Sequence, residues 1–324
     1  MKKLSLLALL LASITQVPLE AAYVFQNGKL MDVKEAATHT LEEHYTLGIE
    51  AIKKKEWKEA ITQFRIVTIN FPDAIQSKEA FYFLGVSYYH NEEMDLANEN
   101  FSEYLKKEAT PKYFEQVFQY KLAIADAFKN GAKKHLFGAR VLPQLMGDKD
   151  LAIALYDEVA NTFPNDELAA KAWLAKGELF REKENFRQAI EAYQTVIKKF
   201  SRTDFAAMAY TAISDAYFNQ AKLEHQNPDL LALAQINLKR FSQEFPRDAR
   251  AETAQQQLSE MKESLAASIY ETGCFYERKS QPQASFLYYN NVISQFPETH
   301  AAQMSKERIA VLQQRVPSDA EKTF

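Results

Sequence analysis

Small, apolar and aromatic residues recur along the chain in a pattern that repeats itself. In the first copy, Leu47-Gly48 are followed by Ala60 and Phe64, and Pro72 closes the unit. Small residues at these places let two helices approach closely. Proline ends the second helix, because it cannot donate into the helical ladder and clashes with the preceding turn. The pattern therefore predicts a helical hairpin.

Further copies follow, six in all. The second contains Phe81, Leu84-Gly85, Tyr88, Ala97 and Phe101; the fourth Trp173, Gly177, Phe180, Ala189 and Tyr193; the sixth Gly273, Tyr276, Tyr289 and Pro297. The spacing matches the tetratricopeptide repeat (TPR), a helical hairpin of about 34 residues. We therefore predict an all-α, right-handed TPR solenoid of about six hairpins, with a C-terminal capping helix over residues 299–315.

The repeat pattern also divides the chain. We expect a signal peptide over 1–21, a linker or N-terminal cap over 22–40, repeats 1–3 over 41–164, repeats 4–6 with the capping helix over 165–315, and a loose tail over 316–324. Repeat 3 is interrupted by a long insertion that contains Gly131 and Gly147, and repeat 5 by a shorter one around Asn227-Pro228. Such insertions often extend a binding surface. A neutral surface loop is the equal alternative.

The first residues have the features of a secretory signal. Lys2 and Lys3 precede the apolar run 4–14, and Ala21-Ala22 provide small residues for cleavage. The run is shorter than the roughly 20 residues that span a bilayer. The alternative is an N-terminal helix that stays attached. Cys274 is the only cysteine, and residues 12–30 contain none that could carry a lipid, so we expect no lipid anchor of that kind.

Composition and motifs exclude several functions. Glycine and proline are scarce, at 8 and 10 residues, which favours helices, and a net charge of −4 makes a nucleic-acid partner unexpected. The histidines are scattered, without a zinc motif or a carboxylate partner, and no phosphate loop or nucleophile elbow occurs. Cys274 is interpreted as inert, and Lys133, Lys134 and His135 as a solvated loop rather than an anion site. We expect no catalytic site, metal or cofactor.

A partner-binding groove is the remaining candidate site. Positions 2, 5, 9 and 12 of the first helix of each repeat line the concave face of a TPR stack. Aromatic and aliphatic side chains at such positions suit an extended or helical peptide with apolar anchors. Packing inside the superhelix is the alternative. The predicted groove residues are Tyr45, Ile49, Tyr82, Val86, Tyr89, Leu174 and Phe218.

Residues 168–315 resemble the BamD family, the periplasmic TPR lipoproteins of the outer-membrane β-barrel assembly machinery. The resemblance depends on the hairpin 172–200, the stretched repeat 210–246 and the segment 251–277, which looks like the long shared helix of the family. It implies a non-catalytic scaffold whose N-terminal repeats receive unfolded outer-membrane proteins and whose C-terminal repeats dock on the barrel-forming subunit. The chain departs from the family in two features. The cysteine that carries the lipid in the family is missing, and residues 41–164 add three repeats beyond the region that matches.

Two functions follow as hypotheses. The first is a scaffold in β-barrel protein assembly, located in the periplasm of a Gram-negative bacterium and associated with the outer membrane only through its partners. The second is a soluble periplasmic adaptor of a Tol-Pal-like system or of peptidoglycan and cell-division enzymes. Both depend on protein or peptide partners.

Overall fold

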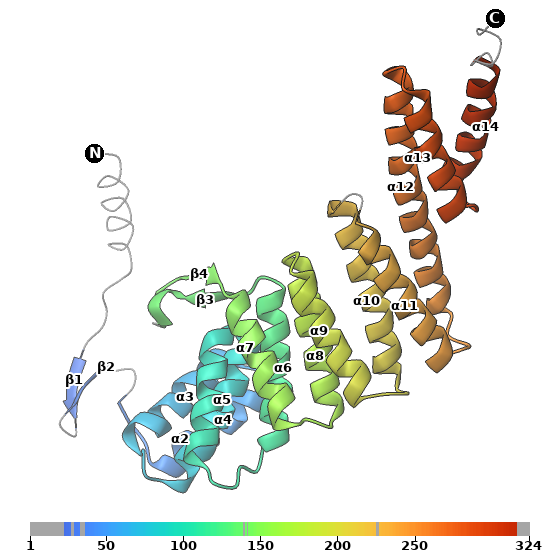
Figure 1. The fold of residues 1–324 in the computed structure, drawn as a ribbon. Helices are drawn as coiled ribbons and strands as arrows, with labels where there is room; N and C mark the ends of the chain where they lie inside the picture. Colours follow the sequence, from blue (N-terminus) through green and yellow to red (C-terminus); the bar gives the residue numbers. More distant parts are fainter. Residues whose placement is uncertain are drawn as a thin grey trace, which may run out of the picture. The chain divides into compact units, whose positions relative to one another are not determined.

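The computed structural model describes residues 23–26, 29–32, 36–138, 140, 142–224 and 227–315. The predicted signal peptide and the predicted tail lie outside these ranges. Thirteen helices occur in the described ranges (Figure 1). They are α2 (Leu41–Lys54), α3 (Trp57–Asn70), α4 (Ile75–His90), α5 (Met94–Lys107), α6 (Phe114–Lys129), α7 (Lys149–Thr162), α8 (Glu167–Glu182), α9 (Phe186–Lys199), α10 (Asp204–Leu223), α11 (Pro228–Glu244), α12 (Arg250–Arg278), α13 (Pro282–Gln295) and α14 (His300–Arg315).

Consecutive helices pack as hairpins: α2 with α3, α4 with α5, α8 with α9, α10 with α11, and α12 with α13. Helix α14 packs on α13 and α12, so it covers the last hairpin. The predicted helical fold with a C-terminal capping helix is confirmed. The chain divides into two compact units, residues 1–148 and 149–324.

In unit 1, a local sequence signal determines where α2 begins, and packing by neighbouring helices explains why α4 is apolar. The Oγ1 of Thr40 accepts the Glu43 N–H at 3.3 Å, while Glu43 Oε2 accepts the Thr40 N–H at 2.9 Å. This reciprocal cap satisfies two backbone donors at the start of α2. Helix α4 is packed by α2 and α3 and also by α5 and α6, which is why buried residues such as Ala80 and Tyr82 occur around it.

A glycine in the first helix lies against an aromatic ring of the second helix in four hairpins. A Cβ atom added to Gly177 would lie 2.4 Å from the Tyr193 ring, and one added to Gly85 would lie 2.5 Å from the Phe101 ring. The same contact recurs in two more pairs, Gly48 with Phe64 and Gly273 with Tyr289. The sequence pattern predicts small residues where these helices meet. The structure adds that the aromatic ring of the second helix occupies the space that a side chain at the glycine would fill.

In the described ranges, two short antiparallel β-hairpins accompany the helices, and neither was expected from the repeat pattern. Strand β1 (Tyr23–Gln26) pairs with β2 (Lys29–Asp32), within the segment that we interpreted as a linker or cap. The intervening Asn27-Gly28 is a strong sequence signal for a two-residue hairpin turn, and it is the signal that the repeat alignment passed over.

The second hairpin is built by the insertion in repeat 3. Strand β3 (Lys133–His135) is followed by a 3₁₀ turn (Leu136–Gly138) and pairs with β4 (Gln144–Gly147). The backbone N–H of His135 donates to Asp95 Oδ2 at 2.7 Å, and the His135 Nδ1 lies 2.9 Å from the same oxygen. Because Asp95 belongs to the first turn of α5, the insertion is fixed to the preceding repeat.

These contacts correct one expectation. His135 is only 5% exposed, and Lys134 forms an ion pair with Asp148, so the interpretation of this segment as a solvated basic loop is wrong. His135 also has a second carboxylate neighbour that the sequence did not indicate, because Glu93 Oε2 lies 3.8 Å from His135 Nε2, in addition to the Asp95 contact. A buried polar ring needs such partners, and these come from a helix distant in sequence.

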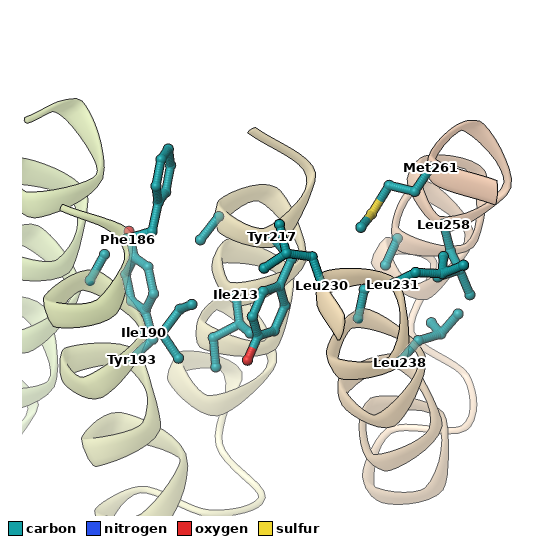
Figure 2. Packing of buried hydrophobic residues seen from close by; sticks show 14 of the residues in the cluster. Phe186, Ile190, Tyr193, Ile213, Tyr217, Leu230, Leu231, Leu238, Leu258 and Met261 are labelled. Atoms are coloured by element: carbon teal, nitrogen blue, oxygen red, sulfur yellow. The ribbon is translucent and has the colours of Figure 1, made fainter. Parts of the chain in front are cut away.

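In unit 2, the core is a series of layers contributed by successive helices (Figure 2). Ile190 and Tyr193 come from α9, Ile213 and Tyr217 from α10, three leucines from α11, and Leu258 with Met261 from α12. The extra residues of repeat 5 mainly lengthen α10, which has 20 residues. The predicted long helix after this repeat is confirmed, because α12 continues for 29 residues.

Buried tyrosines make unit 2 sensitive to alkaline pH. Burial raises the pKa of the Tyr193 hydroxyl to about 12, and burial together with a hydrogen bond to Glu244 raises that of Tyr210 to about 12. In the unfolded chain a tyrosine has a pKa of about 10. Because the folded-state pKa is higher, this stabilisation is complete below pH 10 and is lost as the pH rises towards 12.

We therefore expect the melting temperature to fall steeply between about pH 10 and pH 12. Tyr193 contributes at most roughly 2–3 kcal/mol, as two pKa units correspond to about 2.7 kcal/mol, and Tyr210 contributes less because solvent screens its hydroxyl more. The measurement is a set of thermal melts by circular dichroism across this range. Tyr193→Phe removes one titrating group, so its stability should fall less with pH than that of the original chain. If the stability of Tyr193→Phe and of the original chain fell equally with pH, Tyr193 would not be a source of the alkaline sensitivity.

Candidate functional site

Tyr45 and Ile49 lie on α2 and are half-buried. The Tyr45 hydroxyl donates to Glu79 Oε2 at 2.6 Å, and its ring makes edge contacts with Phe64 and Phe83. Burial, and then the hydrogen bond to Glu79, raise the pKa of Tyr45 well above its usual range. Tyr45 therefore stays neutral, and parts of its side chain and of the neighbouring Ile49 remain exposed, while the assignment of both residues to a groove stays a prediction.

Tyr82 and Val86 lie on α4, and they are buried, at 8% and 7% exposure. The Tyr82 ring stacks on Tyr113 with a centroid separation of 4.0 Å and an interplanar angle of 9°. Phe101 and Tyr104 contact the same ring at 6.0 and 5.7 Å. Both residues therefore have little surface with which to meet a partner in this conformation, and their assignment to the groove stays a prediction.

Tyr89 lies on α4 at its C-terminal end and is half-buried. Its ring meets Tyr120 edge to face at 5.0 Å, Tyr120 stacks on Phe101 at 5.1 Å, and Phe101 contacts Tyr82. Phe83 joins Tyr82 to Tyr45 in the same way. The structure therefore brings the three predicted tyrosines into one connected aromatic cluster.

Some residues of this cluster were not selected from the sequence. Tyr120 is on α6 and is half-buried, and it falls two residues before Leu122, as Tyr45 falls two residues before Leu47. The repeat register was therefore a usable signal for Tyr120. Tyr113 directly precedes α6, outside the regular helical positions, so the register contains no signal for it.

Leu174 lies in unit 2, beside a cavity of about 400 Å³ between α8 and α10. Phe205 and Met208 of α10 complete its apolar part, and Met208 is 43% exposed. The lining also contains charges of both signs, Lys171, Glu178, Arg181 and Asp215. The cavity thus combines an apolar floor with charged groups that could fix the direction of a bound peptide.

Phe218 lies beside a separate cavity of about 210 Å³, formed by α10, α11 and α12. The Nζ of Lys222 lies 3.9 Å from the centroid of its ring, a cation–π contact. Leu231 and Met261 extend the apolar lining, and Glu224 and Glu260 add negative charge. Leu174 and Phe218 therefore line two different cavities, one on each side of α10. Met208 and Met261 were not predicted, because only helix register was used to select residues.

Within the described ranges, no cluster of three or more histidine, cysteine or acidic side chains could hold a metal ion. Cys274 is half-buried, and its Sγ accepts a hydrogen bond from the Tyr289 hydroxyl at 3.3 Å. The same hydroxyl lies 2.9 Å from Glu277 Oε2. Across the part of the chain that the structure describes, every helix is too short or too polar to cross a membrane.

Three solved structures of TPR proteins are similar to the chain at low sequence identity. A TPR repeat protein from Bacteroides fragilis is 14% identical, with a TM-score of 0.42 over 85% of this chain and 100% of that one. A TPR protein from Parabacteroides merdae is 12% identical, with a TM-score of 0.37 over 82% and 96%. The TPR domain of P58(IPK) is 16% identical, with a TM-score of 0.32 over 83% and 77%. No curated protein matches the chain.

The sequence model of the YfiO outer membrane lipoprotein family matches twice, over residues 37–226 and 147–322. The first match alone covers more than half of the chain. It also reaches the N-terminal repeats, which lie outside the region where the family resemblance was recognised from the sequence. The expected relationship is therefore confirmed, and the chain belongs to the YfiO (BamD) family of outer membrane lipoproteins.

Proposed function

We propose that this chain is a non-catalytic periplasmic scaffold that binds protein segments during the assembly of outer-membrane β-barrel proteins. The observation that carries the proposal is the family match, which extends over nearly all the repeats. TPR proteins act through protein–protein contacts, and the cavities beside Leu174 and Phe218 suit this role.

The two units offer different surfaces. In unit 1, the exposed parts of Tyr45 and Tyr89 belong to a packed aromatic cluster, so a partner would meet rings that are already held in place. Ordered aromatic anchors lose little conformational freedom on binding. In unit 2, Met208 is more exposed. Because methionine is an unbranched and adaptable side chain, this position suits apolar segments of varied sequence. We assign capture of unfolded substrates to unit 1 and docking on the barrel-forming subunit to unit 2.

The test is affinity purification of the full chain from detergent-solubilised envelopes, with a groove variant and a matched control. Met208→Glu places a charge in the cavity beside Leu174. Leu287→Glu introduces the same charge at a residue on α13 that is 69% exposed and lines neither the cavity beside Leu174 nor the cavity beside Phe218. We expect the original chain to recover the β-barrel assembly subunit, Met208→Glu to recover about tenfold less, corresponding to about 1.4 kcal/mol, and Leu287→Glu to behave like the original.

The identity of the recovered proteins decides between functions. Recovery of Tol-Pal components or of peptidoglycan enzymes in place of the assembly subunit would refute the proposal and support the adaptor hypothesis. Recovery of the assembly subunit in equal amounts with Met208→Glu would keep the function but move the docking site away from this cavity.

A further inference from the structure

A third hollow in unit 2 is separate from the two cavities described above. It has a volume of about 470 Å³ and is formed by α9, α10 and α11. None of its lining residues lines either of the other two cavities. The lining residues are Gln194, Ile197, Lys198, Tyr210, Ile213, Tyr217, Leu233, Ile236, Asn237 and Arg240. We call this set the α9–α11 groove.

The floor of the α9–α11 groove is formed by Tyr210, Ile213 and Tyr217, which recur along one side of α10. All three are buried, and Figure 2 shows Ile213 and Tyr217 between side chains of α9 and those of α11. Because these side chains are packed by both neighbouring helices, the floor is formed before any ligand binds.

The α11 wall of the groove leaves apolar surface uncovered. Ile236 is 49% exposed and Leu233 is 42% exposed, one turn apart on the same helix. Ile197 of α9 is half-buried and lines the hollow with them. Apolar side chains grouped around a hollow often mark an interaction site, whereas single exposed apolar residues do not.

Asn237 provides a polar group within this apolar lining. It is only 7% exposed, and its Nδ2 donates to the Tyr210 carbonyl and to Ser214 Oγ, both at 2.9 Å. Among the described residues, none donates a hydrogen bond to its Oδ1. This oxygen is not one of the buried side-chain atoms that lack a partner, so it is accessible, and a backbone N–H of a peptide in the groove could donate to it.

The charge of the groove is of one sign. Lys198 and Arg240 line it, both are exposed, and neither forms an ion pair with another described residue. No carboxylate belongs to the lining, although acidic residues line both other cavities. The nearby Glu244 is engaged by the Tyr210 hydroxyl at 2.9 Å and by the Arg202 N–H at 3.0 Å. In a chain of net charge −4, this local positive charge favours an acidic ligand.

We propose that the α9–α11 groove binds an acidic amphipathic segment of a partner protein. Apolar side chains of the segment contact Ile236 and Leu233, its carboxylates pair with Lys198 and Arg240, and one backbone N–H donates to Asn237 Oδ1. This binding site is independent of the proposed function, because it uses none of the residues that line the other cavities.

The experiment places a benzophenone amino acid at position 236 of the full chain in cells, and identifies crosslinked peptides by mass spectrometry. We expect the crosslinked segment to be acidic. The charge reversals Lys198→Glu and Arg240→Glu together should reduce crosslinking at least about tenfold. The matched control combines Lys199→Glu with Lys239→Glu, two neighbouring exposed cations that do not line the groove, and should leave crosslinking unchanged.

A synthetic peptide of the crosslinked segment should then bind the purified chain, with an affinity that falls as salt is added. Crosslinks to neutral or basic segments, crosslinks to lipid, or equal losses in the two double variants would each overturn the proposal. The absence of crosslinks at position 236, while the same reporter at Met208 crosslinks a partner, would also overturn it. This last outcome would leave the function proposed above intact.

Discussion

Replacing Tyr82 with alanine should lower the free energy of unfolding by about 3 kcal/mol or more, because a large buried side chain is removed and a cavity remains. The stacked Tyr113 ring and the Phe101 and Tyr104 rings would all lose a packing partner. Urea denaturation followed by circular dichroism measures the change. Tyr89→Ala is the matched control on the same helix, since Tyr89 is more exposed.

We expect Tyr89→Ala to cost clearly less stability than Tyr82→Ala, and to weaken capture of an unfolded substrate. The two variants thereby separate the stabilising role of the aromatic cluster from its binding role. If Tyr82→Ala unfolded at the same urea concentration as the original chain, Tyr82 would be a groove residue rather than a core residue. Unchanged binding in Tyr89→Ala would remove this end of α4 from the partner surface.

Gly177→Leu should lower the free energy of unfolding by roughly 1–3 kcal/mol, through overpacking of the fourth hairpin. Even the first added carbon would lie 2.4 Å from the Tyr193 ring, so α8 and α9 would have to separate. The effect opposes intrinsic preference, since leucine favours a helix by up to about 1 kcal/mol over glycine. Thermal melts should show a lower melting temperature.

Two controls accompany this variant. Lys183→Ala removes an exposed pair with Asp150 just after α8 and should change stability little. Combining Gly177→Leu with Tyr193→Ala should cost less than the sum of the two single changes, because the added side chain then occupies the space of the ring. Strict additivity, or equal melting temperatures of Gly177→Leu and Lys183→Ala, would contradict the contact.

The fold could be predicted to this extent because each repeat specifies its own hairpin by residues close in sequence. Glycine, alanine and aromatic residues recur at fixed spacing within each hairpin, whereas the long helix α12 was expected from the family resemblance. The insertion could not be resolved in the same way. Its position is fixed by the hydrogen bond from the His135 N–H to Asp95. These residues are 40 apart in the sequence, and their spacing does not follow the repeat pattern. Specific long-range polar contacts of this kind leave no periodic signal in one sequence.

The candidate site was predictable only in part. Tyr45 and Tyr82 share one register position, yet Tyr45 is half-buried and Tyr82 is almost fully buried. The difference arises because Tyr113, which precedes α6 and belongs to no regular repeat position, stacks on Tyr82. Helix register gives the side of a helix on which a residue lies. It does not show whether an irregular segment, such as the one that contains Tyr113, covers that side.

The 29-residue helix α12 also changes how unit 2 can unfold. Repeat proteins commonly lose terminal hairpins one at a time, since each repeat contacts only its neighbours. Here the first half of α12 packs into the core through Leu258 and Met261, while Gly273 in its second half meets Tyr289 of α13. One uninterrupted backbone, roughly 43 Å long, is therefore shared by two hairpins. The C-terminal repeats should consequently exchange their amide hydrogens as one cooperative unit, and not by stepwise fraying from the end of the chain.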